Sequence, residues 1–406
     1  MQFKTVKWFA LFWLIPLLVL PCTTAIVSGR ATPDGRPRLW KHRDSGHEQN
    51  VIRLFADGRF RYFGLVNASD STGKEVWAGV NESGFAIMNS ASYNLKTAED
   101  TTAIKDREGE LMKMALRLCA TLEDFERLLD SLPKPLGVEA NFGVIDAQGG
   151  AAYYETGNFA YQKFDANDSL VAPEGYLIRT NFSFSGKPDA GYGYIRYQMA
   201  EQLFKQAAIG NQLDAEYILS RVSRCLKHAL TGVDLTASDQ SFVSFRDFIP
   251  RKSSVSVVLV RGVESGEDPA KSLMWTILGF PLTGVSLPLW VENMDDIPLL
   301  LKPGADRNAP LCEASLALKE KCFPIRRGNG PYYLNLPVLW NKEGSGILQK
   351  ILPFERSIFK QTTKFEAVLQ DSKNRKEDIE KFYNKIEKAV KQFYGQKFDV
   401  KLEEGQ

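Results

Sequence analysis

The sequence is poor in histidine: its 406 residues include only His42, His47 and His228. No HExxH pattern occurs, and no two of the five cysteines form a CxxC pair. Metal sites are usually built from such closely spaced ligands, so we expect no metal site. The patterns GxGxxG, GxxxxGK[ST] and GxSxG are also missing, which leaves no basis for a nucleotide site, and we expect no cofactor.

A strong excess of one charge is missing as well. Lysine and arginine number 51 and the acidic residues 49, which gives a formal net charge of +2. Nucleic-acid binding usually depends on a clear positive excess, so no nucleic acid is expected as a partner. The remaining composition, 44% hydrophobic and 25% charged, is typical of a globular protein.

Long apolar runs are limited to the first 21 residues. Lys4 and Lys7 precede an apolar run of 13 residues, from Trp8 to Leu20. This length suits the hydrophobic region of a signal peptide better than a membrane span, although a retained anchor is an alternative. We therefore expect an exported protein, periplasmic or extracellular, with no stable membrane span once residues 1–21 are removed.

Five cysteines are an odd number for an oxidising compartment, where disulfides form. Cys312 and Cys322 stand ten residues apart in a stretch that resembles a loop, which favours a local disulfide. Cys119 and Cys225 lie in segments with helical patterns and are expected to be buried thiols. Cys22, directly after the apolar segment, is the cysteine left over.

Short strands and turns alternate with amphipathic helices along the chain. Hairpins are predicted at residues 75–80 with 85–89 and at 141–146 with 151–155. Helices are predicted at 110–117, 122–131, 192–208 and 216–230, and strands at 254–261 and 272–278. This order favours an α+β fold in which helices pack outside antiparallel sheets.

The C-terminal region differs from the rest in composition. Lysine, glutamate and glutamine are frequent after about residue 350, and apolar residues recur at helical spacing. An amphipathic helix packed against the main body is expected, with a partner-binding helix as the alternative. The predicted organisation is a leader at 1–21, a main domain at 22–345 and a helical extension at 346–406.

Cys22 could act as a nucleophile without histidine if it became the first residue. A free α-amine has a pKa of about 7.7–8.0 and a thiol about 8.5. The amine could therefore accept the thiol proton, so that nucleophile and base belong to one residue. Processing is left open, because cleavage after Ala25 would fit signal peptidase better than cleavage after Pro21, yet it would delete Cys22.

Several segments resemble the choloylglycine hydrolase and penicillin V acylase family, and the related isopenicillin-N acyltransferase (peptidase C45) group. In chain order they are Cys22-Thr23-Thr24, Lys41-His42-Arg43-Asp44, Asn81-Glu82-Ser83-Gly84-Phe85-Ala86, the hairpin from Asn141 to Glu155, Arg179-Thr180-Asn181-Phe182, Ile195-Arg196-Tyr197, and Ser253-Ser254-Val255-Ser256. The resemblance extends from Cys22 to about Val291. It implies the four-layer αββα sandwich of N-terminal-nucleophile (Ntn) hydrolases, with two antiparallel sheets.

The resemblance also implies roles for individual residues. Cys22 would be the nucleophile, Asp44 would hold its amine, and Asn181, assisted by Asn89, would stabilise the oxyanion. Arg196 would favour the thiolate. Lys41, where bile-salt hydrolases carry arginine, and Phe182 would contact substrate.

The function implied is hydrolysis of a small-molecule N-acyl amide, of bile-salt, penicillin V or acyl-amine type, through an acyl-thioester on Cys22. An acyltransferase is the first alternative, because an amine could intercept the thioester in place of water. A non-catalytic, lipid-anchored envelope protein is the second. Homo-oligomers are expected from the family.

Overall fold

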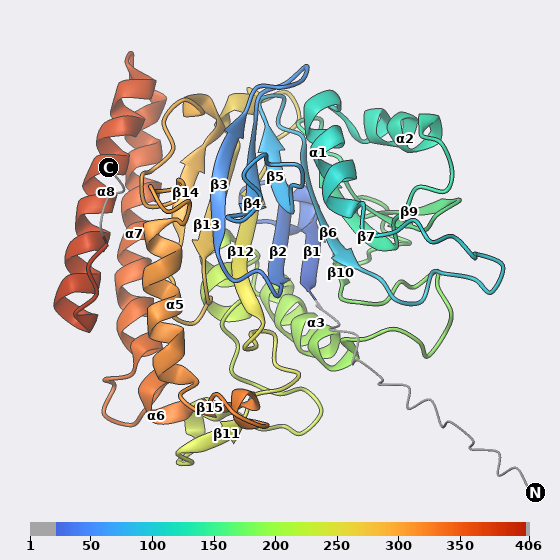
Figure 1. Cartoon of the computed structure of the whole chain (residues 1–406). Helices are drawn as coiled ribbons and strands as arrows, with labels where there is room; N and C mark the ends of the chain where they lie inside the picture. Colours follow the sequence, from blue (N-terminus) through green and yellow to red (C-terminus); the bar gives the residue numbers. More distant parts are fainter. Residues whose placement is uncertain (1–21, 403–406) are drawn as a thin grey trace, which may run out of the picture.

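The computed structural model describes residues 22–402, so the predicted leader at residues 1–21 lies outside the described part. Two antiparallel sheets stacked face to face form the centre of the molecule (Figure 1). The six-stranded sheet has the order β10 (Tyr176–Arg179), β1 (Thr23–Val27), β2 (Arg38–Asp44), β12 (Ser254–Arg261), β13 (Leu273–Leu278), β14 (Leu287–Trp290). The seven-stranded sheet runs in chain order through β3 (Asn50–Phe55), β4 (Tyr62–Asn67), β5 (Ala78–Asn81), β6 (Ala86–Ala91), β7 (Ala140–Ile145), β8 (Ala151–Thr156) and β9 (Tyr161–Asp165).

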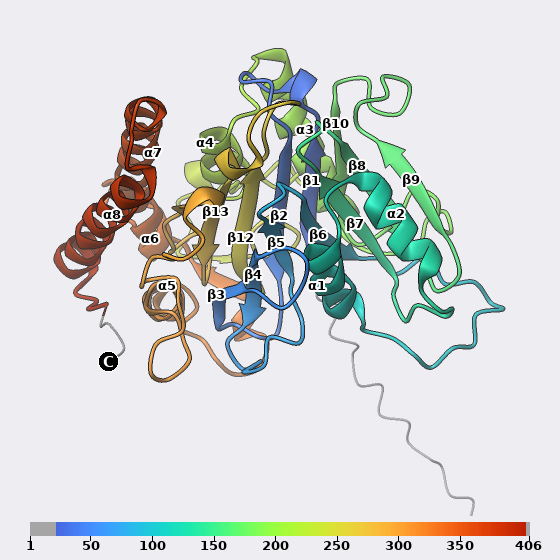
Figure 2. The ribbon, with the colours of Figure 1, turned by 90° about the horizontal axis from the view of Figure 1, so that it is seen from above.

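Helices cover the outer faces of both sheets (Figure 2). On the seven-stranded sheet lie α1 (Glu108–Leu118) and α2 (Leu122–Ser131); α1 packs on β5 and β6. The six-stranded sheet is covered by α3 (Tyr194–Ile209) and by α4 (Ala215–Tyr217), which continues as a π-helix at Ile218–Val222. This arrangement confirms the predicted four-layer αββα sandwich.

Strand alternation assigns each side chain to one of two layers. Trp40 of β2 points to the helices, where its ring packs 5.9 Å from that of Phe204 and its indole N–H donates to Ser223. Thr24 of β1 points to the other sheet, where its hydroxyl accepts from Tyr153 at 2.8 Å. The layer between the sheets therefore contains the odd-numbered residues of the second half of β2, among them Lys41.

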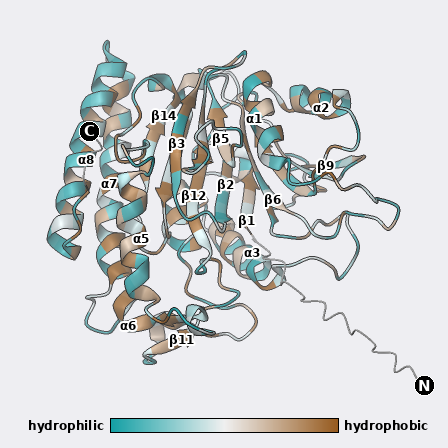
Figure 3. Cartoon of the chain, in the orientation of Figure 1, coloured by the Kyte–Doolittle hydropathy of each residue, from teal (hydrophilic) through white to brown (hydrophobic). Residues whose placement is uncertain are grey.

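The C-terminal region packs on the edge of the six-stranded sheet, and its helices begin before the extension predicted at 346–406. It comprises α5 (Pro310–Cys322), α6 (Leu336–Leu339), α7 (Ile347–Gln370) and α8 (Arg375–Phe398), with β15 (Tyr333–Asn335) paired to β11 (Phe242–Ser244). Trp275 of β13 lies 4.5 Å from Phe359 of α7, and the backbone N–H of Trp290 donates to the hydroxyl of Tyr383 in α8. These contacts give the extension and the body one shared hydrophobic core. Hydrophilic residues face outward on α8 (Figure 3).

Two predictions from the sequence are wrong. The helix expected at 216–230 ends at Val222, because the buried side chain of Arg224 turns inward and donates to the carbonyls of Pro281 and Gly284. Cys312 lies in the first turn of α5 and Cys322 is its last residue, and ten helical residues span about 15 Å. No disulfide can bridge that distance, and both are free thiols.

The other predicted elements agree with the structure. Both hairpins form, as β5–β6 and β7–β8, and Cys119 and Cys225 are free and buried. Cys119 caps α1, whereas Cys225 lies in a turn and not in the helix that was expected. Within residues 22–402, no helix combines the length and apolar character that crossing a bilayer requires.

Candidate active site

Cys22 stands directly before β1, a strand that is hydrogen-bonded on both sides, to β10 and to β2. The ladder pairs Thr23 with His42 and Thr24 with Lys41, so one further step places Cys22 opposite Arg43. The Cβ atoms of such opposed residues are about 4.5–5.5 Å apart. The thiol sulfur of Cys22 lies 3.9 Å from the backbone oxygen of Asp44, and 7% of the residue is exposed.

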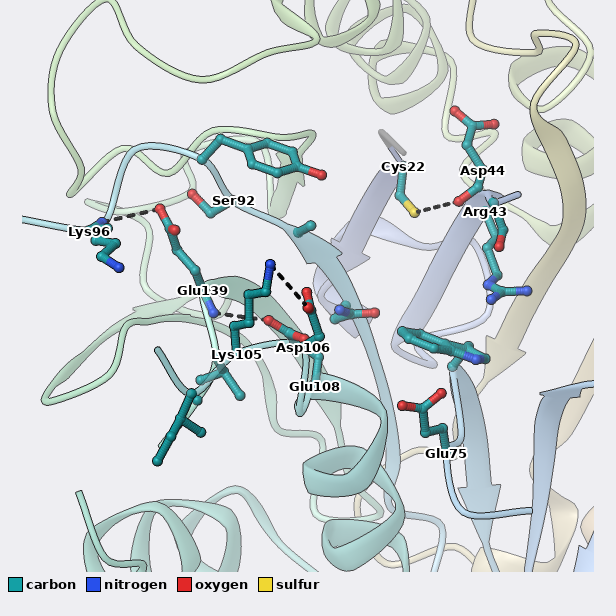
Figure 4. A pocket seen from close by; sticks show the side chains of 18 of the residues that line it. Cys22, Arg43, Asp44, Glu75, Ser92, Lys96, Lys105, Asp106, Glu108 and Glu139 are labelled. Carbon is teal, nitrogen blue, oxygen red and sulfur yellow. Dashed lines mark hydrogen bonds and ion pairs between the residues drawn. The ribbon is translucent and has the colours of Figure 1, made fainter. Parts of the chain in front are cut away.

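A cavity of about 860 Å³ opens beside this thiol (Figure 4). Four of the residues predicted for the site line it: Cys22, Lys41, Asp44 and Asn89. On the side across from Cys22 lie acidic and basic side chains from the start of α1 and the loop before it, including Glu108. Its size is that of a pocket for a small organic ligand.

Lys41 is buried between the two sheets. Its ammonium donates to the backbone oxygen of Trp77 at 2.7 Å and to Oδ1 of Asn89 at 2.6 Å. Burial lowers the pKa of Lys41 to about 7, and the electrostatic interaction with nearby Cys22 offsets part of that shift. Lys41 thus connects the strand beside the nucleophile with the predicted oxyanion residue of the other sheet.

Asp44, the last residue of β2, has a fully buried carboxylate that accepts hydrogen bonds from two side chains. Arg251 donates to Oδ2 at 2.5 Å, and the hydroxyl of Ser254 donates to Oδ1 at 2.6 Å. The register between β2 and β12 shifts at this point, between Ser254 and Ser256. A β-bulge of this kind commonly redirects a side chain next to a functional site.

Arg196 joins the start of β1 to Asn181. The guanidinium of this fully buried residue donates to the carbonyl oxygen of Cys22 at 2.6 Å, to Thr23 at 2.7 Å and to Oδ1 of Asn181 at 2.8 Å. Nδ2 of Asn181 donates to the backbone oxygen of Ala91 at 2.8 Å. Arg196 therefore fixes the backbone of Cys22 and the orientation of Asn181, and its hydrogen bonds go to oxygens, not to the thiol that it was expected to influence.

Phe182 is not brought to the cavity. Its ring packs against those of Phe184, Tyr194 and Tyr197, at centroid distances between 5.4 and 6.1 Å. This aromatic cluster forms where the segment after β10 turns back to meet α3. The predicted contact of Phe182 with substrate therefore finds no support in its location.

The sequence did not identify Arg43, Arg251 and Ser254 as parts of the site. A signal was present for Arg43, because the strand Arg38–Asp44 carries five ionisable side chains and is buried along its whole length. A buried strand of that composition is unusual unless its charges have partners or a function. Arg251 and Ser254 gave no comparable signal, since their contact with Asp44 spans more than 200 residues.

The histidines lie at different places around the site. His42 is buried on the helix side of β2, and burial lowers its pKa to about 4, so it is neutral near pH 7. His47 is exposed and lines the cavity, where it is the one histidine that could act on a substrate there. In the described part of the chain, no group of three or more His, Cys, Asp or Glu residues could hold a metal ion.

Comparisons with known proteins give matches by structure alone: no protein-family model and no curated protein matches the sequence. The chain is similar to a Caenorhabditis elegans N-acylethanolamine-hydrolyzing acid amidase ortholog, with TM-score 0.40 and 14% identity, covering 61% of this chain and 95% of that one. It is also similar to the conjugated bile acid hydrolase of Clostridium perfringens (variant R18L; TM-score 0.40, 11% identity, 68% and 94% covered). Penicillin V acylase from Agrobacterium tumefaciens matches with TM-score 0.35 and 10% identity, over 67% and 86%.

Proposed function

We propose that this chain is a cysteine Ntn amidohydrolase of the choloylglycine hydrolase and penicillin V acylase type, which cleaves a non-peptide amide through Cys22. One observation carries the proposal: a thiol at the start of a central strand lines a cavity of ligand size together with Asn89, which Lys41 orients, while Arg196 holds both Asn181 and the backbone of Cys22. Such a constellation combines a nucleophile with donors for a developing oxyanion.

In the proposed reaction Cys22 is the first residue of the mature protein. Its α-amine accepts the thiol proton, and the sulfur attacks the carbonyl carbon of the bound amide. The tetrahedral intermediate collapses as the carbon–nitrogen bond breaks, and the amine leaves with the proton. Water, activated by the same α-amine, then hydrolyses the thioester and releases the acid.

The two asparagines supply the polar environment of the oxyanion. Lys41 donates to Oδ1 of Asn89 and Arg196 donates to Oδ1 of Asn181, so the amide nitrogen of each asparagine is turned away from the cation. Nδ2 of Asn181 gives one of its two N–H groups to Ala91, which leaves the other for the oxyanion. Preorganised donors of this kind act on the transition state without further rearrangement. Asp44, fixed by Arg251 and Ser254 next to Cys22, is the anion proposed to hold the α-ammonium when the amine carries its proton.

The position of β1 favours processing before Cys22. Thr24 and Ala25 pair with Arg179 and Ile178 on one side and with Lys41 and Trp40 on the other. Cleavage after Ala25 would remove these residues from the middle of a sheet and leave buried backbone groups of both neighbours unpaired, which is costly. We propose an exported protein in which self-cleavage or trimming by a peptidase exposes Cys22.

The test uses the secreted protein with a panel of N-acyl amides of the three proposed types, with Cys22→Ala as the inactive variant. Cys225→Ala is the matched control, because it removes another buried thiol far from the cavity. Turnover should disappear only in Cys22→Ala, and acid-quenched wild type should carry one acyl group on an N-terminal Cys22. A mature terminus at Ile26, or a lipid on Cys22, would disprove the proposal.

A further inference from the structure

The floor of the cavity contains two cations from one strand. Lys41 and Arg43 lie two residues apart on β2, so both side chains point into the layer between the sheets, where Cys22 lies. They are 1% and 3% exposed, and both line the cavity. Arg43 was not anticipated as a site residue.

Every polar contact of these two cations is to a neutral oxygen. Arg43 donates to Oδ1 of Asn50 and to Oδ1 of Asn67, at 2.8 Å for the latter, and its guanidinium lies 4.8 Å from the ring centroid of Trp77. Lys41 donates to Trp77 and Asn89, as described above. Within the described chain, no carboxylate lies within 4.0 Å of either cation.

The acidic residues around the cavity either bind other groups or lie too far from Lys41 and Arg43 to form an ion pair with them. Asp44 is neutralised by Arg251, and the carboxylate of Glu108 accepts the backbone N–H of Glu139 at 3.0 Å. Burial raises the pKa of Glu108 to about 7, which weakens it as a counter-ion, and Glu75 interacts with Arg43 only at long range. Two buried cations therefore lack a paired anion of their own.

A buried charge is costly unless an anion or several dipoles compensate it. A Cys22 thiolate would neutralise one of the two cations, since it interacts with both. Lys41, whose pKa is about 7, is charged only in part near neutral pH, whereas burial lowers the pKa of Arg43 only to about 10, so Arg43 stays charged. Two asparagine oxygens and one tryptophan ring fix the orientation of the Arg43 guanidinium. Such a preorganised guanidinium is suited to bind the two oxygens of a carboxylate, sulfonate or phosphate.

We propose that Lys41 and Arg43 form an anion subsite beside Cys22, and that the amide cleaved here carries an anionic group within a few bonds of its scissile carbonyl. The inference rests on the proposed function in taking the Cys22 cavity as the substrate site. It goes further by defining a charge that the substrate must carry. The anion could belong to the acyl part or to the leaving amine, and the experiment separates these two sources.

The first test does not require turnover. Iodoacetate and iodoacetamide have nearly the same shape and alkylate the same thiolate, but only the former is anionic. The rate of alkylation by iodoacetate is divided by the rate with iodoacetamide, and this ratio is measured at Cys22 by peptide mass spectrometry. It is compared with the same ratio for a small free thiol at the same pH and salt. A charge-assisted contact makes the ratio about 10- to 100-fold higher at Cys22 than for the reference.

Arg43→Gln should bring this ratio back to the reference value, and Arg43→Lys should restore part of the preference. Arg59→Gln, which removes an exposed loop arginine outside the cavity, is the matched control and should retain the wild-type ratio. If Arg43→Gln fails to fold, the wild-type ratio and its decline with added salt still decide the question. A wild-type ratio equal to the reference, or no reaction of Cys22 with either reagent, overturns the subsite.

The second test uses turnover by wild type. N-acylglycine is compared with N-acylglycinamide, and an N-alkyl succinamate with its neutral diamide, so that each pair differs by one charge. A preference of about 10-fold or more in kcat/KM for one anionic member supports the subsite and identifies the side on which the anion lies. Turnover without any charge preference overturns the subsite alone, whereas a charge preference in alkylation without turnover of any amide overturns the proposed function alone.

Discussion

The ammonium of Lys41 lies 2.6 Å from Oδ1 of Asn89, and this contact joins the two sheets at the edge of the cavity. Arg196 makes the equivalent contact with Oδ1 of Asn181, at 2.8 Å, on the other side of Cys22. Both asparagines are thereby held with their oxygens turned to a cation. Buried cations that orient amides are costly for folding, so their presence on both sides of a thiol favours a functional explanation.

Replacing Lys41 by methionine should lower kcat/KM and raise stability at the same time. Asn89 loses its orienting donor, while a buried charge is removed, which stabilises by about 1–4 kcal/mol where it has been measured for buried ions. Folding lowers the pKa of Lys41 from 10.5 to about 7, so the unfolded chain binds one more proton between these values. The free energy of unfolding of wild type therefore rises with pH from about 7 to 10.5 through this group.

The Lys41→Met protein should lack this component of the pH dependence. Urea unfolding at pH 6, 8 and 10 gives the free energy of unfolding of wild type and of the variant. The difference between the two should shrink toward high pH. Lys360→Met, at an exposed position of α7, serves as control and should leave the difference from wild type independent of pH. A Lys41→Met variant less stable than wild type at pH 6 would contradict the assignment.

His47 distinguishes two kinds of cysteine chemistry. It is the histidine that lines the cavity, so a cysteine–histidine mechanism would have to use it. In the proposed Ntn mechanism the base is the α-amine, and His47→Ala should change kcat less than about threefold. A loss of 10²-fold or more, the range typical of a missing general base, would favour the histidine mechanism instead.

Asn181→Ala should lower kcat by about 10²- to 10³-fold, the usual effect of removing one oxyanion donor. Because the defect lies in the transition state, KM should change much less than kcat. Asn329→Ala, at an exposed position in the loop after α5, is the control and should leave both constants unchanged. A rise in KM with kcat unchanged would assign Asn181 to substrate binding.

The sequence predicted the sheets and the candidate nucleophile better than the support around them. Alternating apolar residues and short turns fixed the two hairpins, and the position of Cys22 relative to Asp44 follows from one strand pair. The partners of Asp44 could not be predicted, because Arg251 and Ser254 approach it only after β12 has paired with β2. A local sequence pattern cannot predict a contact between residues so far apart in the chain.

The errors concern segments in which local pattern and tertiary packing disagree. α5 was missed because the stretch that carries Cys312 and Cys322 resembled a loop, although the helix begins at Pro310, and proline is well suited to the first turn of a helix. The helix expected to continue to Leu230 stops where Arg224 forms a buried ion pair with Glu355 of α7. The arginine gave no local sign that it would be drawn into the core.

The contact between Asp44 and Arg251 should be strongly coupled in stability. Removing one partner leaves a buried, uncompensated charge, which costs about 3–5 kcal/mol. Arg251→Gln, which leaves the fully buried Asp44 carboxylate without its cation, should therefore destabilise by that order. Asp44→Asn should destabilise less, because Arg251 is partly exposed, and the double variant should lose clearly less than the sum. Additive losses in urea unfolding would show that the carboxylate is held by Ser254 alone.

The number of reactive thiols tests both the cysteine assignments and the N-terminus. Burial raises the pKa of Cys119, Cys312 and Cys322 to about 12 and that of Cys225 to about 11, so these four should resist alkylation in the folded protein near pH 8. Cys22, which lines the cavity, should then be the single thiol labelled. In denaturant without reductant all five should react, because all five are free. Four labels with a terminus at Ile26 would mean that Cys22 had been removed with the leader. Three labels would reveal a disulfide and contradict the assignment of all five cysteines as free thiols.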